Sequence, residues 1–165
     1  MTMKQFKSAI ITGPTGAIGM ALIEQLLSEN FSVLAVCHKN SARINRLPKH
    51  KNLSVLECNL DELATLSTFT SQKYDIFYHF AWDGTFGNTR NNIQGQIKNI
   101  KYTLDAVEVA HALGCKRFIG AGSQAEYGRV EGKISASTPT FPENGYGIAK
   151  LCAGQMSRIR CEQLG

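Results

Sequence analysis

A serine, a tyrosine and a lysine in the second half of this sequence could move a proton to or from a carbonyl or hydroxyl oxygen. They are Ser123, Tyr146 and Lys150. Tyr146 and Lys150 are four residues apart near the start of a predicted helix over about 143–163, so their side chains share one helix face. A tyrosine with the reference pKa of about 10 shuttles protons poorly at neutral pH, and a neighbouring ammonium favours its phenolate. The three residues therefore suit proton transfer, with the serine hydroxyl bonded to the reacting oxygen.

A glycine-rich segment near the amino terminus could hold the phosphates of a dinucleotide. Its glycines are spaced by three residues and lie between an apolar, strand-like run and a helical pattern. In the dinucleotide fingerprint the first glycine permits a tight turn, the second admits the pyrophosphate, and the third lets the helix pack on the strand. Amides at the helix start, at the positive end of the helix dipole, then bind the phosphates. The expected cradle consists of Gly13, Thr15, Gly16, Ala17, Ile18 and Gly19.

The segment after the second predicted strand bears on the choice of dinucleotide. A site that prefers NAD usually ends this strand with Asp or Glu, about 18 residues past Gly19, and this acid binds the adenosine ribose hydroxyls. Cys37 takes that place here, and His38, Lys39 and Arg43 follow without an acid. A basic segment tolerates or attracts a 2′-phosphate, so the sequence predicts NADP rather than NAD. The alternative is a solvated turn that happens to be basic.

The elements that must position these residues alternate between apolar strands and helical patterns. Strands are predicted at 8–12, 32–37, 53–57, 75–80 and 117–121, and helices at 17–29, 61–70, 89–113 and 143–163. This alternation predicts an α/β fold with right-handed βαβ units and a doubly wound parallel sheet. Ser123 then follows the last strand, at the sheet edge where such folds bind ligands. A chain of this length without a linker or repeat is expected to form one domain over 1–165.

Composition argues against several other classes. The 18 Lys and Arg residues are scattered and the formal net charge is only +5, so the basic stripe of a nucleic-acid binder is missing. No apolar run is long enough to cross a bilayer, and no signal-peptide pattern is present. The cysteines and histidines have neither CxxC nor metal-ligand spacing. We therefore expect a cytoplasmic protein with no metal, no nucleic-acid partner and no membrane partner.

In this order, the motifs resemble the amino-terminal part of the extended short-chain dehydrogenase/reductases, the NAD-dependent epimerase/dehydratase family that acts on nucleotide sugars. The resemblance runs along almost the whole chain. It rests on TGxxGxxG at 12–19, Cys58-Asn59-Leu60, His79-Phe80-Ala81, Asn99, the segment 122–128 and YxxxK at 146–150. It implies a Rossmann-type sheet in the order 3-2-1-4-5 and a homodimer formed through the two long helices.

The resemblance also implies roles for individual residues. Asn59 and Leu60 would lie near the adenine, and Phe80 and Ala81 would line the cofactor groove. Asn99 would support the hydrogen-bond network of the active site. The implied catalytic set is Ser123, Tyr146, Lys150 and Asn99, with Tyr146 and Lys150 also contacting the cofactor.

Departures from the family pattern narrow the expected reaction. Asn59 stands where Asp is usual, and Trp82 replaces the small residue usual after His-x-Ala, so the nicotinamide or sugar pocket is expected to be reshaped. Gln124 and Ala125 occupy the places where family dehydratases carry an acidic pair. Glu126 comes one place later and is expected to point elsewhere. Dehydration is therefore disfavoured.

The remaining reactions are reduction and epimerisation. An NADP-type pocket suits an enzyme that consumes reduced cofactor, so a 4-keto-sugar reductase is the first expectation and an NAD-dependent 4-epimerase the second. A non-catalytic dinucleotide-binding or sensing module is a third alternative. The chain ends at Gly165, whereas the family continues into a substrate-binding domain. We therefore expect a truncated fragment that binds a dinucleotide and turns over little alone.

Overall fold

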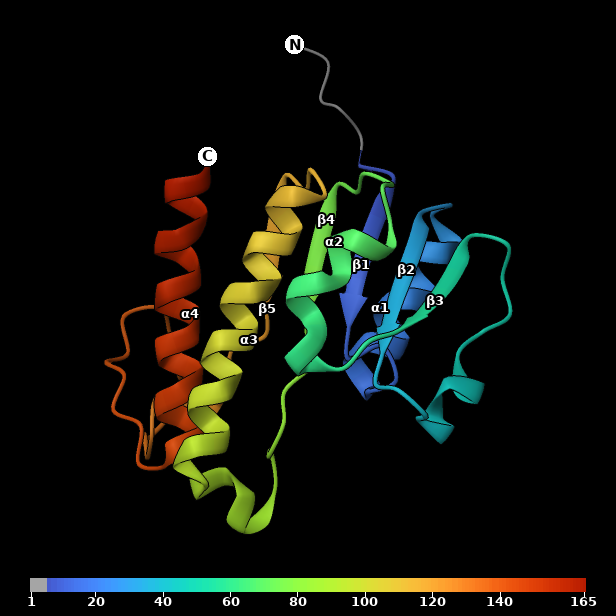
Figure 1. Cartoon of the computed structure of the whole chain (residues 1–165). Coiled ribbons are helices and arrows are strands. Elements are labelled where there is room, and N and C mark those ends of the chain that lie inside the picture. Colours follow the sequence, from blue (N-terminus) through green and yellow to red (C-terminus); the bar gives the residue numbers. More distant parts are fainter. Residues whose placement is uncertain (1–5) are drawn as a thin grey trace. The chain divides into compact units, whose positions relative to one another are not determined.

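The computed structural model describes residues 6–165 (Figure 1). Its tertiary contacts divide the chain into two compact units. Unit 1 comprises the residues up to Ala81 together with Asp105–Gly120, and unit 2 comprises Trp82–Leu104 and Ala121–Gly165. Helix α3 contributes its first part to unit 2 and its last part to unit 1.

Unit 1 is built on a five-stranded parallel sheet in the order β3-β2-β1-β4-β5 (Figure 1). Its strands are β1 (Ser8–Thr12), β2 (Ser32–Cys37), β3 (Leu53–Glu57), β4 (Ile76–His79) and β5 (Arg117–Gly120). Thr12 pairs with Val36 on one side and with His79 on the other, so these three strands end together. The α/β class, the parallel pairing and the strand order confirm the predicted Rossmann-type sheet.

The α-helices are α1 (Ala17–Ser28), α2 (Leu66–Phe69), α3 (Ile93–Ala112) and α4 (Gly145–Leu164). Within unit 1, α1 and the part of α3 from Asp105 onward pack on opposite faces of the sheet, so the central strands are buried on both faces. Alternate residues of a strand point to opposite faces. Ile10 and Phe77 therefore share one core with Val109 of α3, whereas Ile11 lies in a second core with Ile23 of α1. Burial on both faces explains why these strands read as continuous apolar runs.

The helix predicted over 61–70 differs from the observed structure. A 3₁₀ helix, η2 (Leu60–Thr65), leads instead into the single turn of α2. The Oγ1 hydroxyls of Thr65 and Thr68 donate to carbonyls three residues earlier, each at 2.7 Å. Such side-chain bonds to the backbone compete with the regular α-helical pattern, which accounts for the shortened α-helix.

Unit 2 is organised around α4. Two further 3₁₀ helices, η3 (Gly87–Asn91) and η4 (Gln124–Glu126), contact α4. The sequence predicts a loop and a helix start within the η3 region, whereas α3 begins only at Ile93. Helix α4 begins at its N-cap Asn144, whose Oδ1 accepts the N–H of Gly147 at 2.9 Å. The chain just before Tyr146 and Lys150 is thus fixed by a capped helix start.

Candidate functional site

The glycine segment of unit 1 forms the tight turn that a dinucleotide phosphate requires. Gly13 has a φ of +69°, in the left-handed region. A Cβ atom on Gly13 would lie 2.8 Å from the backbone nitrogen of Ala81, and one on Gly19 would lie 2.8 Å from Cα of Pro14. A Cβ on Gly16 would meet only the Gly13 carbonyl, at 3.5 Å, within 4 Å among residues 6–165. The chain itself therefore requires glycine at 13 and 19, and leaves Gly16 open toward a ligand.

The start of α1 offers its amides to an anion. Gly16 is the N-cap and supplies no side-chain cap, and the first turn carries no acidic residue. Gly16, Ala17 and Ile18 are all exposed, while Thr15 is half-buried in the turn before them. The first amides of a helix have no partner within the helix. The segment thus combines free donors with the positive end of the helix dipole, the arrangement that binds phosphate.

Thr12 joins the ends of β1 and β4 next to this turn. Its Oγ1 lies 2.9 Å from Nδ1 of His79 and accepts the N–H groups of Phe80 and Ala81 at 3.2 and 3.3 Å. Thr12 and His79 are both buried. His79 therefore acts as a structural, hydrogen-bonded residue. The same bonds place the backbone of Phe80 and Ala81 beside Gly13, where the resemblance expects a cofactor groove.

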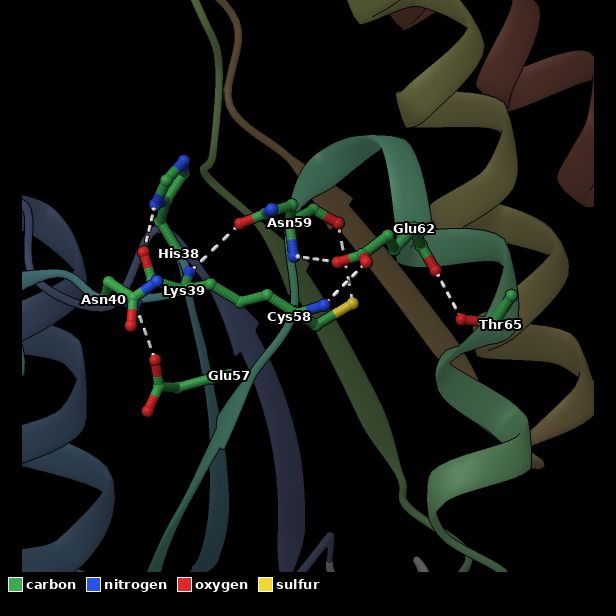
Figure 2. A network of polar contacts seen from close by, with 8 residues as sticks. All are labelled: His38, Lys39, Asn40, Glu57, Cys58, Asn59, Glu62 and Thr65. Carbon is green, nitrogen blue, oxygen red and sulfur yellow. Dashed lines mark hydrogen bonds and ion pairs between the residues drawn. The ribbon is translucent and has the colours of Figure 1, made fainter.

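The basic segment after β2 belongs to a polar network with two acids (Figure 2). Lys39 Nζ forms an ion pair with Glu62 Oε1 at 2.6 Å, and the Lys39 N–H donates to Asn59 Oδ1 at 3.0 Å. Asn40 N–H donates to Glu57 Oε2 at 2.7 Å. The hydrogen bond to Glu62 raises the pKa of Lys39, and the same bond lowers the pKa of Glu62. Lys39 is thus a paired cation, and this pairing could not be predicted from the residues around Lys39 in the sequence.

The other residues predicted near the adenosine lie around this network. His38 Nδ1 is 2.7 Å from the Lys39 carbonyl oxygen. Arg43 is exposed in the 3₁₀ helix η1 (Ala42–Arg46), and its N–H donates to Ser41 Oγ at 3.3 Å. Leu60 packs against the first core as the opening residue of η2. The structure therefore gathers most of the predicted adenosine-side residues at the ends of β2 and β3.

In unit 2, Lys150 is buried against an aromatic ring. It is 7% exposed, its Nζ donates to the Ala121 carbonyl at 2.9 Å, and it lies 3.8 Å from the centroid of the Trp82 ring. Burial lowers the pKa of Lys150 to about 8, and the negative charge of Glu126 partly opposes this. The Trp82 ring also meets Tyr146 edge-on, with centroids 6.0 Å apart. Trp82 thus contacts both members of the YxxxK pair.

Arg90, which the sequence analysis does not select, lies against the same tyrosine. Its guanidinium carbon is 4.7 Å from the Tyr146 ring centroid, within cation–π range. The neighbouring Asn91 accepts the N–H of Gly145 through Oδ1 at 2.9 Å, which ties η3 to the first residue of α4. Asn91 and Gly145 are 54 residues apart in the chain, so no local spacing could have predicted the contact.

Two buried amides of α3 fix the loop that carries Trp82. Asn99 accepts the N–H of Asp83 through Oδ1 at 3.0 Å and donates to the Asp83 carbonyl at 2.8 Å. Gln96 accepts the Trp82 indole N–H at 2.9 Å and donates to the Gly84 carbonyl at 2.9 Å. Asn99 and Gln96 are 1% and 2% exposed. Asn99 therefore supports the loop beside the Tyr146–Lys150 pair, and Gln96, which the sequence analysis missed, does so as well.

Ser123 is held by Glu126, contrary to the expectation that this carboxylate points elsewhere. Ser123 N–H donates to Glu126 Oε1 at 2.6 Å, and Ser123 Oγ accepts the N–H of Ala125 at 3.2 Å. These bonds form a capping box at the start of η4. The alternation of a strand does not apply because the chain turns into a 3₁₀ helix after Ser123. Glu126 therefore fixes Ser123 and also acts electrostatically on Lys150.

Replacing Glu126 by glutamine is expected to lower the pKa of Lys150 below about 8, because the charge that opposes the effect of burial is lost. Glutamine keeps an acceptor for the Ser123 N–H, so η4 should remain folded. The titration of the Lys150 side chain by NMR measures the shift. Glu131→Gln, which removes the same charge from an exposed position, is the control, and an equal shift in both variants would contradict the assignment.

Comparison with known proteins identifies the family. The model of the NAD dependent epimerase/dehydratase family matches residues 9–165. The chain belongs to this family. It is 30% identical over 146 residues to the dTDP-6-deoxy-L-talose 4-dehydrogenase (NAD(+)) of Aggregatibacter actinomycetemcomitans, covering 86% of this chain and 50% of that protein. It is 27% identical to UDP-glucose 4-epimerase 4 of Oryza sativa subsp. japonica, covering 92% and 44%. This epimerase/dehydratase chain thus spans about half the length of the curated relatives it matches.

Solved structures share its fold. The WbmG enzyme of Bordetella bronchiseptica, in complex with NAD, matches with a TM-score of 0.79 and 21% identity, over 96% of this chain and 51% of that one. A UDP-galactose 4-epimerase matches with a TM-score of 0.78 and 21% identity, over 90% and 50%. Within residues 6–165, no helix of this family member has the length and apolar character needed to cross a membrane. Over the same residues, no group of three or more His, Cys, Asp or Glu side chains is placed to hold a metal.

Proposed function

We propose that the chain is the dinucleotide-binding and proton-transfer part of an oxidoreductase that acts at C4 of a nucleotide sugar. A 4-keto-sugar reductase is the first candidate, because the relative that is 30% identical is named a 4-dehydrogenase that uses NAD(+). The observation that carries this proposal is unit 2 itself, in which Ser123 and the Tyr146–Lys150 pair are each held by buried or capped neighbours. The absence of an acidic pair at Gln124 and Ala125 argues against elimination of water.

Each residue of this set has a role in the proposed reduction. Tyr146 Oη donates a proton to the sugar oxygen, and Ser123 Oγ hydrogen-bonds the same oxygen. Lys150, with its pKa lowered to about 8 by burial, takes up and releases a proton close to neutral pH and so favours proton return to the phenol. When bound, the reduced nicotinamide cofactor supplies the hydride that reaches C4, so the carbonyl gains one hydride and one proton.

The cofactor is proposed to be NAD, with NADP as the alternative. The cradle at Gly13, Gly16 and Gly19 suits the pyrophosphate of either dinucleotide. The dehydrogenase relative carries NAD(+) in its name, and the WbmG structure is a complex with NAD. The ion pair of Lys39 with Glu62 weakens the argument that the basic segment attracts a 2′-phosphate.

A nucleotide-sugar 4-epimerase is the second candidate. Relatives named UDP-glucose 4-epimerase match more than nine-tenths of this chain, and an epimerase can keep one NAD through turnover. We also propose that residues 1–165 are the dinucleotide-binding domain of a longer enzyme. This is supported by the relatives, of which the chain covers about half the length. The proposal further includes a homodimer through α3 and α4, supported by exposed apolar side chains. These are Ile93, Ile97, Ile148, Met156 and Ile159.

The test compares NADH binding with turnover. Net oxidation of NADH by a nucleotide-linked 4-keto-sugar indicates the reductase, whereas interconversion of UDP-glucose and UDP-galactose without net consumption of cofactor indicates the epimerase. Tyr146→Phe should lower either rate by about 10²- to 10⁴-fold, because the proton donor is lost, while NADH affinity changes less than about tenfold. Tyr78→Phe removes a hydroxyl from β4 and is the matched control. NADH binding without turnover in a protein that also contains the substrate-binding part would favour a binding module, and no NADH binding would refute the proposal.

A further inference from the structure

We propose that Glu62 makes this chain discriminate against NADP. Its carboxylate already pairs with the Lys39 ammonium, which a 2′-phosphate would need as its own partner. The inference rests on the proposed dinucleotide-binding function. It goes beyond that function by assigning cofactor selectivity to a residue outside the glycine fingerprint and outside β2, where the acid that selects NAD usually lies.

Both members of the ion pair have a second anchor, as Figure 2 shows. Glu62 Oε2 accepts the N–H of Asn59 at 3.2 Å, while its Oε1 accepts Lys39 Nζ at 2.6 Å. The backbone of Lys39 is held in turn, because its N–H donates to Asn59 Oδ1. Asn59 thus fixes the acid through its backbone and the lysine segment through its side chain. The ion pair therefore belongs to a hydrogen-bond network that joins the segment after β2 to η2.

A second acid lies at the same edge of the sheet. Glu57 ends β3 in register with Cys37, the residue that replaces the usual acid of β2, and its Oε2 accepts the N–H of Asn40. A carboxylate can accept hydrogen bonds from ribose hydroxyls, whereas it repels a phosphate dianion. The carboxylate that β2 lacks is thus supplied by the neighbouring strand, and this arrangement also favours NAD.

The charge balance sets the size of the expected effect. Lys39 is paired with Glu62, so the segment after β2 offers one fewer unpaired cation than its sequence suggests. The side chains of Lys39 and Glu62 are 45% and 40% exposed. Because exposed ion pairs contribute at most about 1 kcal/mol, a 2′-phosphate competes for Lys39 at a disadvantage of up to about fivefold.

The decisive variant is Glu62→Gln. Glutamine can still accept the Asn59 N–H and keep the capping box, but it carries no charge to pair with Lys39. Dissociation constants of NAD and NADP are measured for the full chain by calorimetry at low ionic strength, where charge effects are largest. We expect NADP to bind about threefold to fivefold more tightly than to the wild type, with the NAD constant changed less than about twofold.

Two controls separate the ion pair from a general change of charge. Asp61→Asn removes the same charge one residue earlier, from an exposed side chain without an ion pair among the described residues, and should shift the NADP constant by less than about twofold. Adding Lys39→Gln to Glu62→Gln should abolish the gain. An unchanged NADP constant in Glu62→Gln, or an equal gain in Asp61→Asn, overturns the inference while leaving dinucleotide binding intact. A wild-type chain that binds neither dinucleotide refutes the proposed function together with the inference.

Discussion

Lys150→Met is expected to stabilise the folded chain at neutral pH by about 2 kcal/mol while removing the ammonium from the YxxxK pair. The lysine is 7% exposed, and burial lowers its pKa from 10.5 to about 8. The difference, 10.5 minus about 8, corresponds to about 3 kcal/mol of destabilisation when the side chain is charged. The lost hydrogen bond to the Ala121 carbonyl offsets about 1 kcal/mol of the gain. A buried ammonium that destabilises the fold is typical of a residue kept for function, so the stability effect fits a functional role for Lys150.

The sign of the pH dependence follows from the lowered pKa. Below about pH 8, Lys150 is protonated in both the folded and the unfolded chain, so the destabilisation is fully present. Between about 8 and 10.5 the unfolded chain binds more protons, so wild-type stability rises with pH relative to Lys150→Met. Urea unfolding of both proteins at pH 7 and about pH 10 measures the difference. Lys98→Met, at an exposed position of α3, is the control, and a pH-independent difference for Lys150→Met would contradict the buried ammonium.

Gly13→Ala should lose both stability and NADH binding, whereas Gly16→Ala should lose NADH binding alone. At position 13 a methyl group would meet the backbone of Phe80 and Ala81 within 3 Å and would have to adopt a left-handed φ. Such strain costs about 1–3 kcal/mol or more. At position 16 the methyl group meets only ordinary contacts within the chain, but it would stand where the pyrophosphate approaches.

Thermal unfolding and NADH fluorescence titration separate these two effects. The melting temperature of Gly16→Ala should stay within about 2 °C of the wild type, with NADH affinity reduced at least about tenfold. Gly154→Ala, in an open position of α4, should leave NADH affinity unchanged and should raise the melting temperature, because alanine is favoured over glycine inside a helix by about 1 kcal/mol. Full NADH affinity in Gly16→Ala would show that the cofactor phosphates do not approach this turn.

The strands of unit 1 could be predicted from sequence because each is a continuous apolar run between turn residues. The bounds of β1, β2 and β3 match the predicted 8–12, 32–37 and 53–57 to the residue. The shared face of Tyr146 and Lys150 could also be predicted, because helical spacing alone determines it. These patterns are local in the sequence, so the elements can be predicted without knowing which distant segments the fold brings together.

The contacts that define the site chemistry are not local. In the sequence, Lys39 has basic neighbours. Its partner Glu62 is identified only in the fold, where the segment after β2 lies beside η2. Trp82 is visible as an unusual residue, but its position over the Lys150 ammonium depends on Gln96, which lies on α3. The Ser123–Glu126 pair differs, because S-x-x-E is a capping-box pattern readable from the sequence. The prediction that Glu126 points elsewhere was wrong because it assumed that strand alternation continues after β5, where the 3₁₀ helix η4 begins.

Trp82 is the only tryptophan of the chain, and its ring contacts both the Lys150 ammonium and the Tyr146 ring. The indole fluorescence of the protein therefore originates beside the YxxxK pair. Because a cation lies 3.8 Å from the indole centroid, we expect the fluorescence of Trp82 to change when Lys150 loses its proton. A residue that departs from the family pattern thus supplies the chain with an intrinsic optical probe beside Lys150 and Tyr146.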